Sequence, residues 1–209
     1  MKYEDIKNPI DLIEYMDSSI KYGFLDEYGN GYDLLNDSEA INYIDKWTMS
    51  TPEEVFEHGY ALAFDQVEFE RDWFTKNNYE VKTYAVIMNV SDSDEHAIHT
   101  FLVYKNEDGK WNLFENADGR NKGIYTFDFI NQAITFEVDK HIENNSSIYE
   151  LTDDMIRSIK IYEYTKPEYG IDMNNFLSYI FDKSVEATGA ILIEEDDSID
   201  YDEEESDEE

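Results

Sequence analysis

One helix constrains the fold of this chain more than any other segment. Between Ala61 and Lys76 the apolar side chains lie on most sides of a predicted helix, as is typical of a helix buried on several sides. Three strand-like runs follow, at residues 79–90, 97–104 and 111–115. The last two are joined by Asn106–Lys110, which contains the Asp-Gly pair of a hairpin turn. We therefore predict an α+β fold with an antiparallel sheet packed on a central helix.

Further helices, strands and loops are predicted before and after this unit along the chain. Asn8 and Pro9 precede an apolar stripe and predict a helix that ends near Ile20. Thr51 and Glu54 have the spacing of a capping box, which predicts another helix start. The remaining predictions are a loop at 22–31, a helix at 38–47, a strand at 123–127, a helix at 128–141, a polar loop at 143–147, a helix at 152–159, a strand at 160–165 and a helix at 173–187.

Charge separates the end of the chain from the rest. The 209 residues contain 50 Asp and Glu against 16 Lys and Arg, a formal net charge of −34. Twelve of those acidic residues lie within residues 194–209, the acidic tail, which we expect to be disordered. Residues 1–193 keep a net charge of −22, but their aromatic content favours a folded body. We therefore expect an N-terminal helical segment (1–50), an α+β core (51–193) and the tail.

Several classes of function are disfavoured by what the sequence lacks. The chain has no cysteine, which excludes disulfides, thiolate metal sites and thiol catalysis. Four scattered histidines do not suggest zinc, and the segment 26–37 matches a calcium loop poorly, so we expect no metal and no cofactor. With no secretory signal and no long apolar run, we expect a cytoplasmic protein that does not enter a membrane.

Three segments together resemble a known family. They are Gly59–Arg71, His99–Tyr104 and Trp111–Glu115, and their order and spacing are similar to those of the transglutaminase-like branch of the papain-like cysteine hydrolases. A closing segment at 162–176 extends the resemblance to roughly residues 45–180. The resemblance implies a papain-like sheet packed on a central helix. It also implies a nucleophilic Cys at the position of Ala63, a catalytic base at His99 and an orienting carboxylate at Glu115.

Ala63 departs from that pattern in the residue that matters most. A methyl group cannot act as a nucleophile, so we expect a pseudoenzyme in which Ala63, His99 and Glu115 are vestigial positions and no residue is catalytic. The alternative is a transglutaminase-like peptidase, amidase or acyl-transferase whose Cys has been replaced by Ala. Without the resemblance, a histidine on an apolar strand such as His99 is more often a hydrogen-bonded core residue than a catalytic one, and a glutamate near a hairpin end such as Glu115 is usually solvated.

The acidic charge suggests the kind of partner. Direct binding to nucleic acid is disfavoured because the few Lys and Arg form no stripe. In an extended tail the carboxylates recur about every 4.5 Å, close to the roughly 3.4 Å phosphate spacing of one nucleic-acid strand. The expected binding residues are therefore Glu194, Glu195, Asp196, Asp197, Asp200, Asp202, Glu203, Glu204, Glu205, Asp207, Glu208 and Glu209.

In this charge the chain resembles the host-takeover proteins by which bacteriophages mimic DNA and inhibit host enzymes. The resemblance implies an inhibitor that occupies a basic nucleic-acid-binding surface of a host protein, with RNA polymerase as the first candidate, in the host cytoplasm. A third reading is a substrate-binding pseudoenzyme whose tail only increases solubility. The sequence leaves the oligomeric state open.

Overall fold

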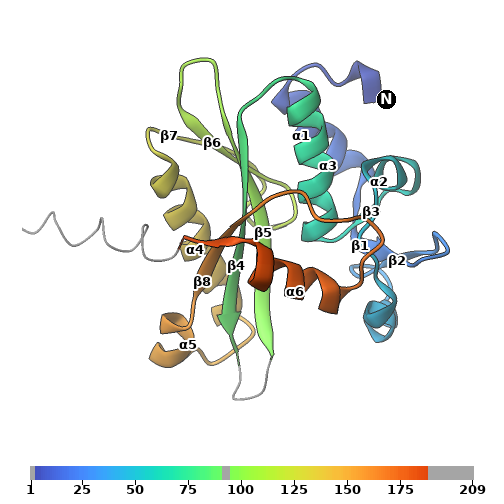
Figure 1. Cartoon of the computed structure of the whole chain (residues 1–209). Helices are drawn as coiled ribbons and strands as arrows, with labels where there is room; N and C mark the ends of the chain where they lie inside the picture. Colours follow the sequence, from blue (N-terminus) through green and yellow to red (C-terminus); the bar gives the residue numbers. More distant parts are fainter. Residues whose placement is uncertain (1–2, 91–94, 188–209) are drawn as a thin grey trace, which may run out of the picture.

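A computed structural model describes residues 3–90 and 95–187 of the chain (Figure 1). The fold is a mixture of helix and sheet, as predicted. The helices are η1 (Tyr3–Asp5), α1 (Pro9–Ser19), η2 (Ala40–Lys46), α2 (Pro52–His58), α3 (Ala63–Lys76), α4 (Ile130–Ser146), α5 (Asp153–Arg157) and α6 (Met173–Lys183). The strands are β1 (Lys21–Leu25), β2 (Gly31–Asp33), β3 (Tyr60–Ala61), β4 (Val81–Asn89), β5 (His96–Lys105), β6 (Trp111–Glu115), β7 (Gly123–Phe127), β8 (Lys160–Tyr164) and β9 (Val185–Glu186).

A six-stranded antiparallel sheet is the largest element, with the strand order β7-β6-β5-β4-β8-β9. Its longest pairing is between β4 and β5, in which Val86 lies opposite His99. The predicted hairpin joins β5 to β6, and Gly109 in its turn has a φ of +80°, which glycine adopts without strain. The sheet therefore contains the antiparallel hairpin that the sequence predicts.

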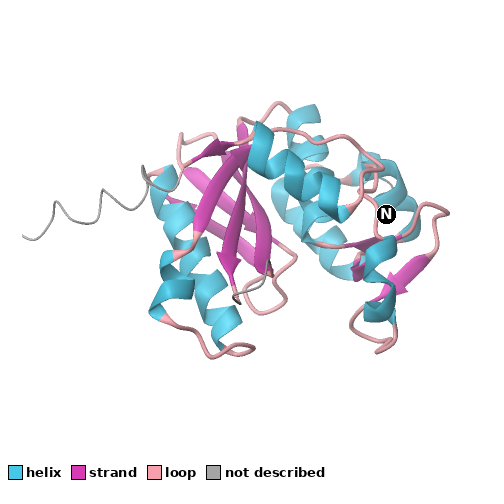
Figure 2. Ribbon diagram, turned by 60° about the horizontal axis from the view of Figure 1, so that its bottom comes forward, coloured by secondary structure: helices cyan, strands magenta, loops and turns pink. Residues whose placement is uncertain are grey.

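Helices cover both faces of this sheet (Figure 2). On one face, Leu102 and Phe114 join a core that includes Phe69 and Phe74 of α3. On the other face, a second core contains the apolar side of α4 together with alternate strand residues; its strand members are Tyr84, Val86, Met88, Phe101, Val103, Leu113 and Ile161. Because side chains alternate across a strand, each residue of β5 is assigned to one of these two faces.

The glycine-rich stretch after α1 is not the loop that the sequence predicts. It contains β1 and β2, which form a three-stranded sheet in the order β2-β1-β3. The β1–β3 pair is parallel and joins Lys21 to Tyr60 and Tyr22 to Ala61. Thus the first fifty residues are not only helical, and several of their apolar side chains share one core with α3.

Three other boundaries differ from those predicted. The helix predicted to end at His141 continues as α4 to Ser146, so most of the predicted polar loop at 143–147 is helical. The last predicted helix ends at Lys183, and Val185–Glu186 forms the edge strand β9 instead. The segment near Ala40 forms a 3-10 helix. Residues 188–209 lie outside the described residues, and so does the acidic tail.

The first helices begin where the sequence predicts. The Asn8 side chain accepts hydrogen bonds from two backbone N–H groups at the start of α1. Thr51 and Glu54 form the predicted capping box at the start of α2, with Thr51 Oγ1 accepting from the Glu54 N–H and Glu54 Oε2 accepting from the Thr51 N–H. These local bonds satisfy backbone donors that have no partner inside the helix.

Substituting Gly59 with Ala is expected to destabilise the protein by about 2 to 4 kcal/mol. Gly59 ends α2 at a φ of +71°, and an added Cβ would lie 2.7 Å from the Ser19 carbonyl oxygen, so backbone strain and a backbone clash act together. Gly170→Ala is the matched control, because Gly170 has a φ of +77° but open space around its Cα. Urea unfolding of both variants measures the difference, and equal losses would contradict the role of the Ser19 contact.

Candidate functional site: a histidine and two buried glutamates

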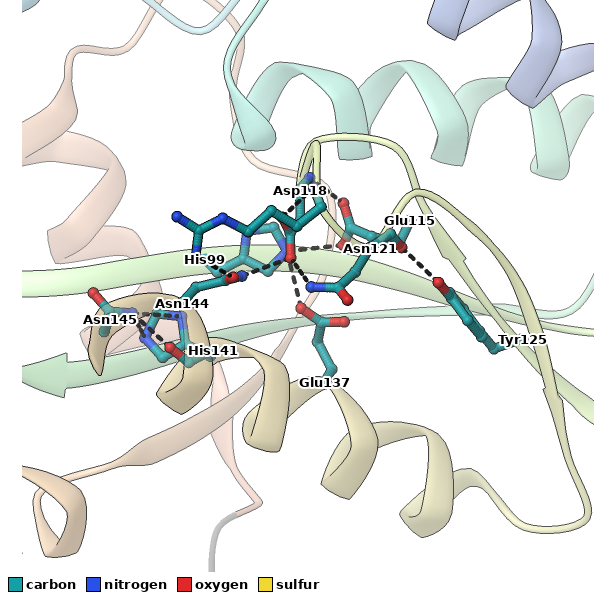
Figure 3. Close-up of polar contacts among 10 residues, drawn as sticks. His99, Glu115, Asp118, Asn121, Tyr125, Glu137, His141, Asn144 and Asn145 are labelled. Carbon is teal, nitrogen blue, oxygen red and sulfur yellow. Dashed lines mark hydrogen bonds and ion pairs between the residues drawn. The ribbon is translucent and has the colours of Figure 1, made fainter. Parts of the chain in front are cut away.

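The sheet and α4 bring one histidine and two glutamates together (Figure 3). His99 Nε2 lies 2.9 Å from Glu115 Oε2 and 3.2 Å from Glu137 Oε1. His99 lies on β5, Glu115 at the end of β6 and Glu137 in the middle of α4. We refer to these three residues as the His–Glu cluster.

Strand alternation explains why these side chains meet. Phe101 and Val103 of β5 point into the core beside α4, and His99 lies two residues earlier on the same face. On β6, Leu113 points into that core, and Glu115 follows it by two residues. The two polar residues therefore end the apolar face of their strands and meet the polar side of α4.

The carboxyl groups of the cluster are almost fully buried. Glu115 and Glu137 are each 2% exposed. Glu115 Oε1 accepts a hydrogen bond of 2.7 Å from the Asp118 backbone N–H, which fixes the orientation of this carboxylate. Glu137 Oε2 is buried and has no hydrogen-bond partner among the described residues. This oxygen atom is therefore an unsatisfied buried acceptor, which a proton or a cation would satisfy.

The electrostatics of the cluster favour a charged imidazole. Burial by itself lowers the pKa of His99, but Glu115 and Glu137 outweigh it and raise that pKa well above its usual value. Burial raises the pKa of Glu137; the contact with His99 lowers it again, while Glu115 and Asp118 raise it. The arrangement is an imidazolium held between two carboxyl groups.

The His–Glu cluster borders a cavity of about 740 Å³. Its walls come from distant parts of the chain: β1 contributes Tyr22, α3 contributes Gln66, the segment after β6 contributes Asp118, and α4 contributes Glu137 and His141. The cavity gives solvent and small molecules access to the buried cluster.

Gln66 connects the start of α3 to the same region. Its Nε2 donates to the Ala61 carbonyl oxygen at 3.2 Å, and its Oε1 accepts from Asn116 Nδ2 at 2.7 Å. Asn116 directly follows Glu115, so this pair of bonds ties the beginning of the central helix to the end of β6. Gln66 thus braces the start of α3 against the end of β6.

Asp65 holds the N-terminus of α3 in place. Its carboxylate accepts hydrogen bonds from Trp47 Nε1 and the backbone N–H groups of Ser50 and Leu62, at 2.9, 2.9 and 3.1 Å. Burial raises the pKa of Asp65 to about 7, although these three bonds act in the opposite direction. Ala63 lies within this fixed helix start and is 5% exposed.

The structure brings together two of the three positions that the sequence predicts to be vestigial. His99 and Glu115 are hydrogen-bonded to one another. Ala63 begins α3 but is not among the residues that line the cavity, to which α3 contributes Gln66. The twelve acidic residues predicted to bind a partner, in the acidic tail, lie outside the described residues.

Two carboxylates of the segment 26–37 are engaged in local hydrogen bonds. Asp26 accepts hydrogen bonds from two backbone N–H groups, from the Asn30 amide and from the Tyr32 hydroxyl. Asp33 makes a similar set of contacts with Leu35 and Asn36. Both carboxylates therefore stabilise turns.

Sequence reasoning missed Glu137 and its neighbours on α4. His141 is buried, and its ring lies 6.5 Å from the ring of His99, centroid to centroid. Burial, followed by the charge of His99, lowers the pKa of His141 to about 4, so it is neutral near pH 7. Glu137, His141, Asn144 and Asn145 recur at intervals of four, three and one residues, which places them on one side of a helix, and this spacing was the available signal.

Comparisons with known proteins assign no family to this arrangement. No protein-family model matches the chain, and a search of curated proteins finds no significant match. Within residues 3–90 and 95–187, no helix combines the length and the apolar character needed to cross a lipid bilayer.

Proposed function

We propose that this chain is a non-catalytic acidic interaction protein that occupies a basic nucleic-acid-binding surface of a partner, with a bacterial RNA polymerase as the first candidate. The observation that carries the proposal is the charge of the folded body. The described residues contain 36 Asp and Glu against 15 Lys and Arg. Ten of those fifteen basic residues form ion pairs with acidic ones. The described residues therefore carry an excess of 21 negative charges (36 − 15).

Most of the acidic side chains of the body face solvent. The buried ones are Asp26, Asp65, Glu68, Glu70, Glu115 and Glu137. Exposed carboxylates produce a long-range negative potential, which attracts basic surfaces and speeds association with them. The acidic tail would extend this potential beyond the body, and direct binding to the phosphates of nucleic acid would be repelled by it.

A displacement assay tests the proposal. Fluorescently labelled DNA is bound to a bacterial RNA polymerase, and the full chain is added at low salt. We expect the chain to release the DNA. The matched control keeps the length of the acidic tail but replaces its twelve carboxylates with amides, and we expect this variant to compete more weakly. If the chain releases DNA neither from the polymerase nor from any of a set of other DNA-binding proteins, the proposal is refuted.

An inactive transglutaminase-like hydrolase is the second candidate, and the hydrogen bond between His99 and Glu115 favours it. In the papain-like arrangement a carboxylate orients the histidine that activates a Cys at the start of the central helix. Here the histidine–carboxylate pair is in place, and Gln66 shows that the first turn of α3 reaches the cavity beside His99. A Cys at position 63 would also lie at a helix N-terminus, which lowers a thiol pKa.

Ala63→Cys is expected to create a reactive thiol if the second candidate is correct. Its reaction with iodoacetamide at pH 6 should be about ten-fold or more faster in the presence of His99 than in the double variant Ala63→Cys, His99→Ala, because a nearby imidazolium stabilises the thiolate beyond the effect of the helix N-terminus, which both variants share. Mass spectrometry of the labelled protein over time gives both rates. Equal rates would remove the second candidate and leave the first unaffected.

A further inference from the structure

We propose that the His–Glu cluster is a site for a divalent transition-metal ion, with Zn²⁺ as the ion it fits best. The sequence suggested no metal site, because Glu137 joins His99 and Glu115 only in the folded chain. The proposal goes beyond the interaction function above and stands independently of it.

Geometry is the first support. Zn²⁺ binds histidine nitrogen and carboxylate oxygen at about 2.0 to 2.2 Å, so neighbouring ligand atoms around it lie roughly 3 to 3.5 Å apart. His99 Nε2 is 2.9 Å from Glu115 Oε2 and 3.2 Å from Glu137 Oε1. All three atoms lie within 4.8 Å of one another. The three ligand atoms are thus already gathered.

The second support is that the His–Glu cluster has more hydrogen-bond acceptors than hydrogens to satisfy them. His99 Nε2 carries at most one hydrogen, and two carboxylate oxygens compete for it. Glu137 Oε2 is left buried without a partner among the described residues. Glu70, which is 2% exposed, also has a buried and unpartnered Oε2, and it interacts electrostatically with Glu115 and His99. A metal ion between Nε2 and the two carboxylates would satisfy more of these atoms than one proton can.

Charge is the third support. Buried carboxylates are costly unless a cation compensates them. The basic residues that line the cavity have other partners, since Lys21 pairs with Asp33, Lys122 pairs with Asp17, and Arg120 donates to Ser147 and Asn144. Among the described residues that line the cavity, His99 is therefore the cation in contact with Glu115 and Glu137. A divalent ion would supply the missing positive charge.

The ligand set and its surroundings indicate the class of metal. One imidazole and two carboxylates suit Zn²⁺ or a similar transition metal, whereas Mg²⁺ and Ca²⁺ prefer oxygen ligands alone. The Asp118 N–H orients Glu115, and Asn121 and Asn144 both donate to Asp118 Oδ2 at 2.6 Å, so the first ligand shell is supported by a second one. The cavity leaves a coordination position open to water or a small ligand.

Equilibrium dialysis of the full chain against Zn²⁺ tests the site. Millimolar Mg²⁺ is included so that exposed carboxylates, including those of the acidic tail, are already occupied by a weakly bound cation. We expect one Zn²⁺ per chain by elemental analysis. In Glu137→Gln, which keeps the size of the side chain, the dissociation constant should rise about 10-fold to 100-fold. Glu143→Gln removes an exposed carboxylate of the same helix and should leave it unchanged.

Thermal unfolding provides a second readout that separates metal binding from loss of the fold. Zn²⁺ should raise the melting temperature of the full chain and of Glu143→Gln, and EDTA should reverse the change. Glu137→Gln should remain folded by circular dichroism, and at the same Zn²⁺ concentration its melting temperature should rise less. Zn²⁺ binding that is equally tight in Glu137→Gln, or the absence of saturable binding in the full chain, would overturn the proposal.

Discussion

Raising the salt concentration from 50 to 200 mM is expected to weaken binding of this chain to a basic partner by about 1,000-fold. The estimate corresponds to roughly six ion contacts of the kind made between proteins and nucleic-acid phosphates. The described body carries a large excess of exposed carboxylates, and twelve more lie in the acidic tail. Because salt screens exposed charges, a complex formed mainly by such contacts must lose affinity steeply. Fluorescence anisotropy at several salt concentrations measures the slope.

The variant with amides in place of the tail carboxylates shows how much of this salt dependence comes from the acidic tail and how much from the folded body. Replacing the tail carboxylates with amides removes charge and keeps length, so we expect a weaker complex and a shallower dependence on salt. An unchanged affinity and slope would show that the body alone binds. A slope near zero for the full chain would mean that apolar contacts dominate, which contradicts mimicry of a polyanion.

Local sequence signals predicted the parts of the fold that depend on neighbouring residues. The capping box at Thr51 and the Asp-Gly turn at Gly109 need only a few adjacent residues, and both are present. The strands β1 and β2 were missed because their glycines indicate a loop. The parallel partner of β1 is Tyr60–Ala61, more than thirty residues away, and a short strand of this kind is defined by pairing and not by its own pattern.

In the candidate site, too, the sequence indicates some residues, whereas others are identified only from long-range contacts in the folded chain. The sequence indicates His99 and Glu115 because their spacing resembles a family pattern and they lie on strands predicted to be adjacent. It does not indicate Glu137, since its contact with His99 spans 38 residues and depends on α4 packing against the sheet. The apolar side of α4 predicts a helix, but its spacing alone does not indicate which strand residues the polar side of α4 contacts. A buried cluster contributed by three elements requires the tertiary structure before it can be identified.

The protein is expected to become more stable as the pH falls from 8 to about 5. Burial raises the pKa values of Asp65, Glu68, Glu70 and Glu137, and the two glutamates of the cluster raise that of His99. A group whose pKa is higher in the folded state stabilises that state fully below its unfolded pKa, and this stabilisation is lost as pH rises through the folded pKa. All five groups therefore act in the same direction.

His141 acts in the opposite direction below about pH 6.5. Its pKa is lowered to about 4 in the folded protein, so acidification through its ordinary value of 6.5 favours the unfolded chain. The carboxylates of Asp26, Asp33 and Asp118 have lowered pKa values and also lose their stabilising contribution in acid. We therefore expect a maximum near pH 5 and a decline below it.

Asp65→Asn isolates one contribution to this pH dependence. The pKa of Asp65 rises from 3.8 to about 7 on folding, and each pKa unit corresponds to about 1.4 kcal/mol. Between pH 7 and pH 5 the variant should therefore gain about 2 to 3 kcal/mol less stability than the unmodified chain. Asp139→Asn, at an exposed position on α4, is the control for the loss of one negative charge. Urea unfolding followed by tryptophan fluorescence provides the free energies. Parallel pH profiles for all three proteins would show that general repulsion among surface carboxylates, and not the buried Asp65, controls the stability of this chain.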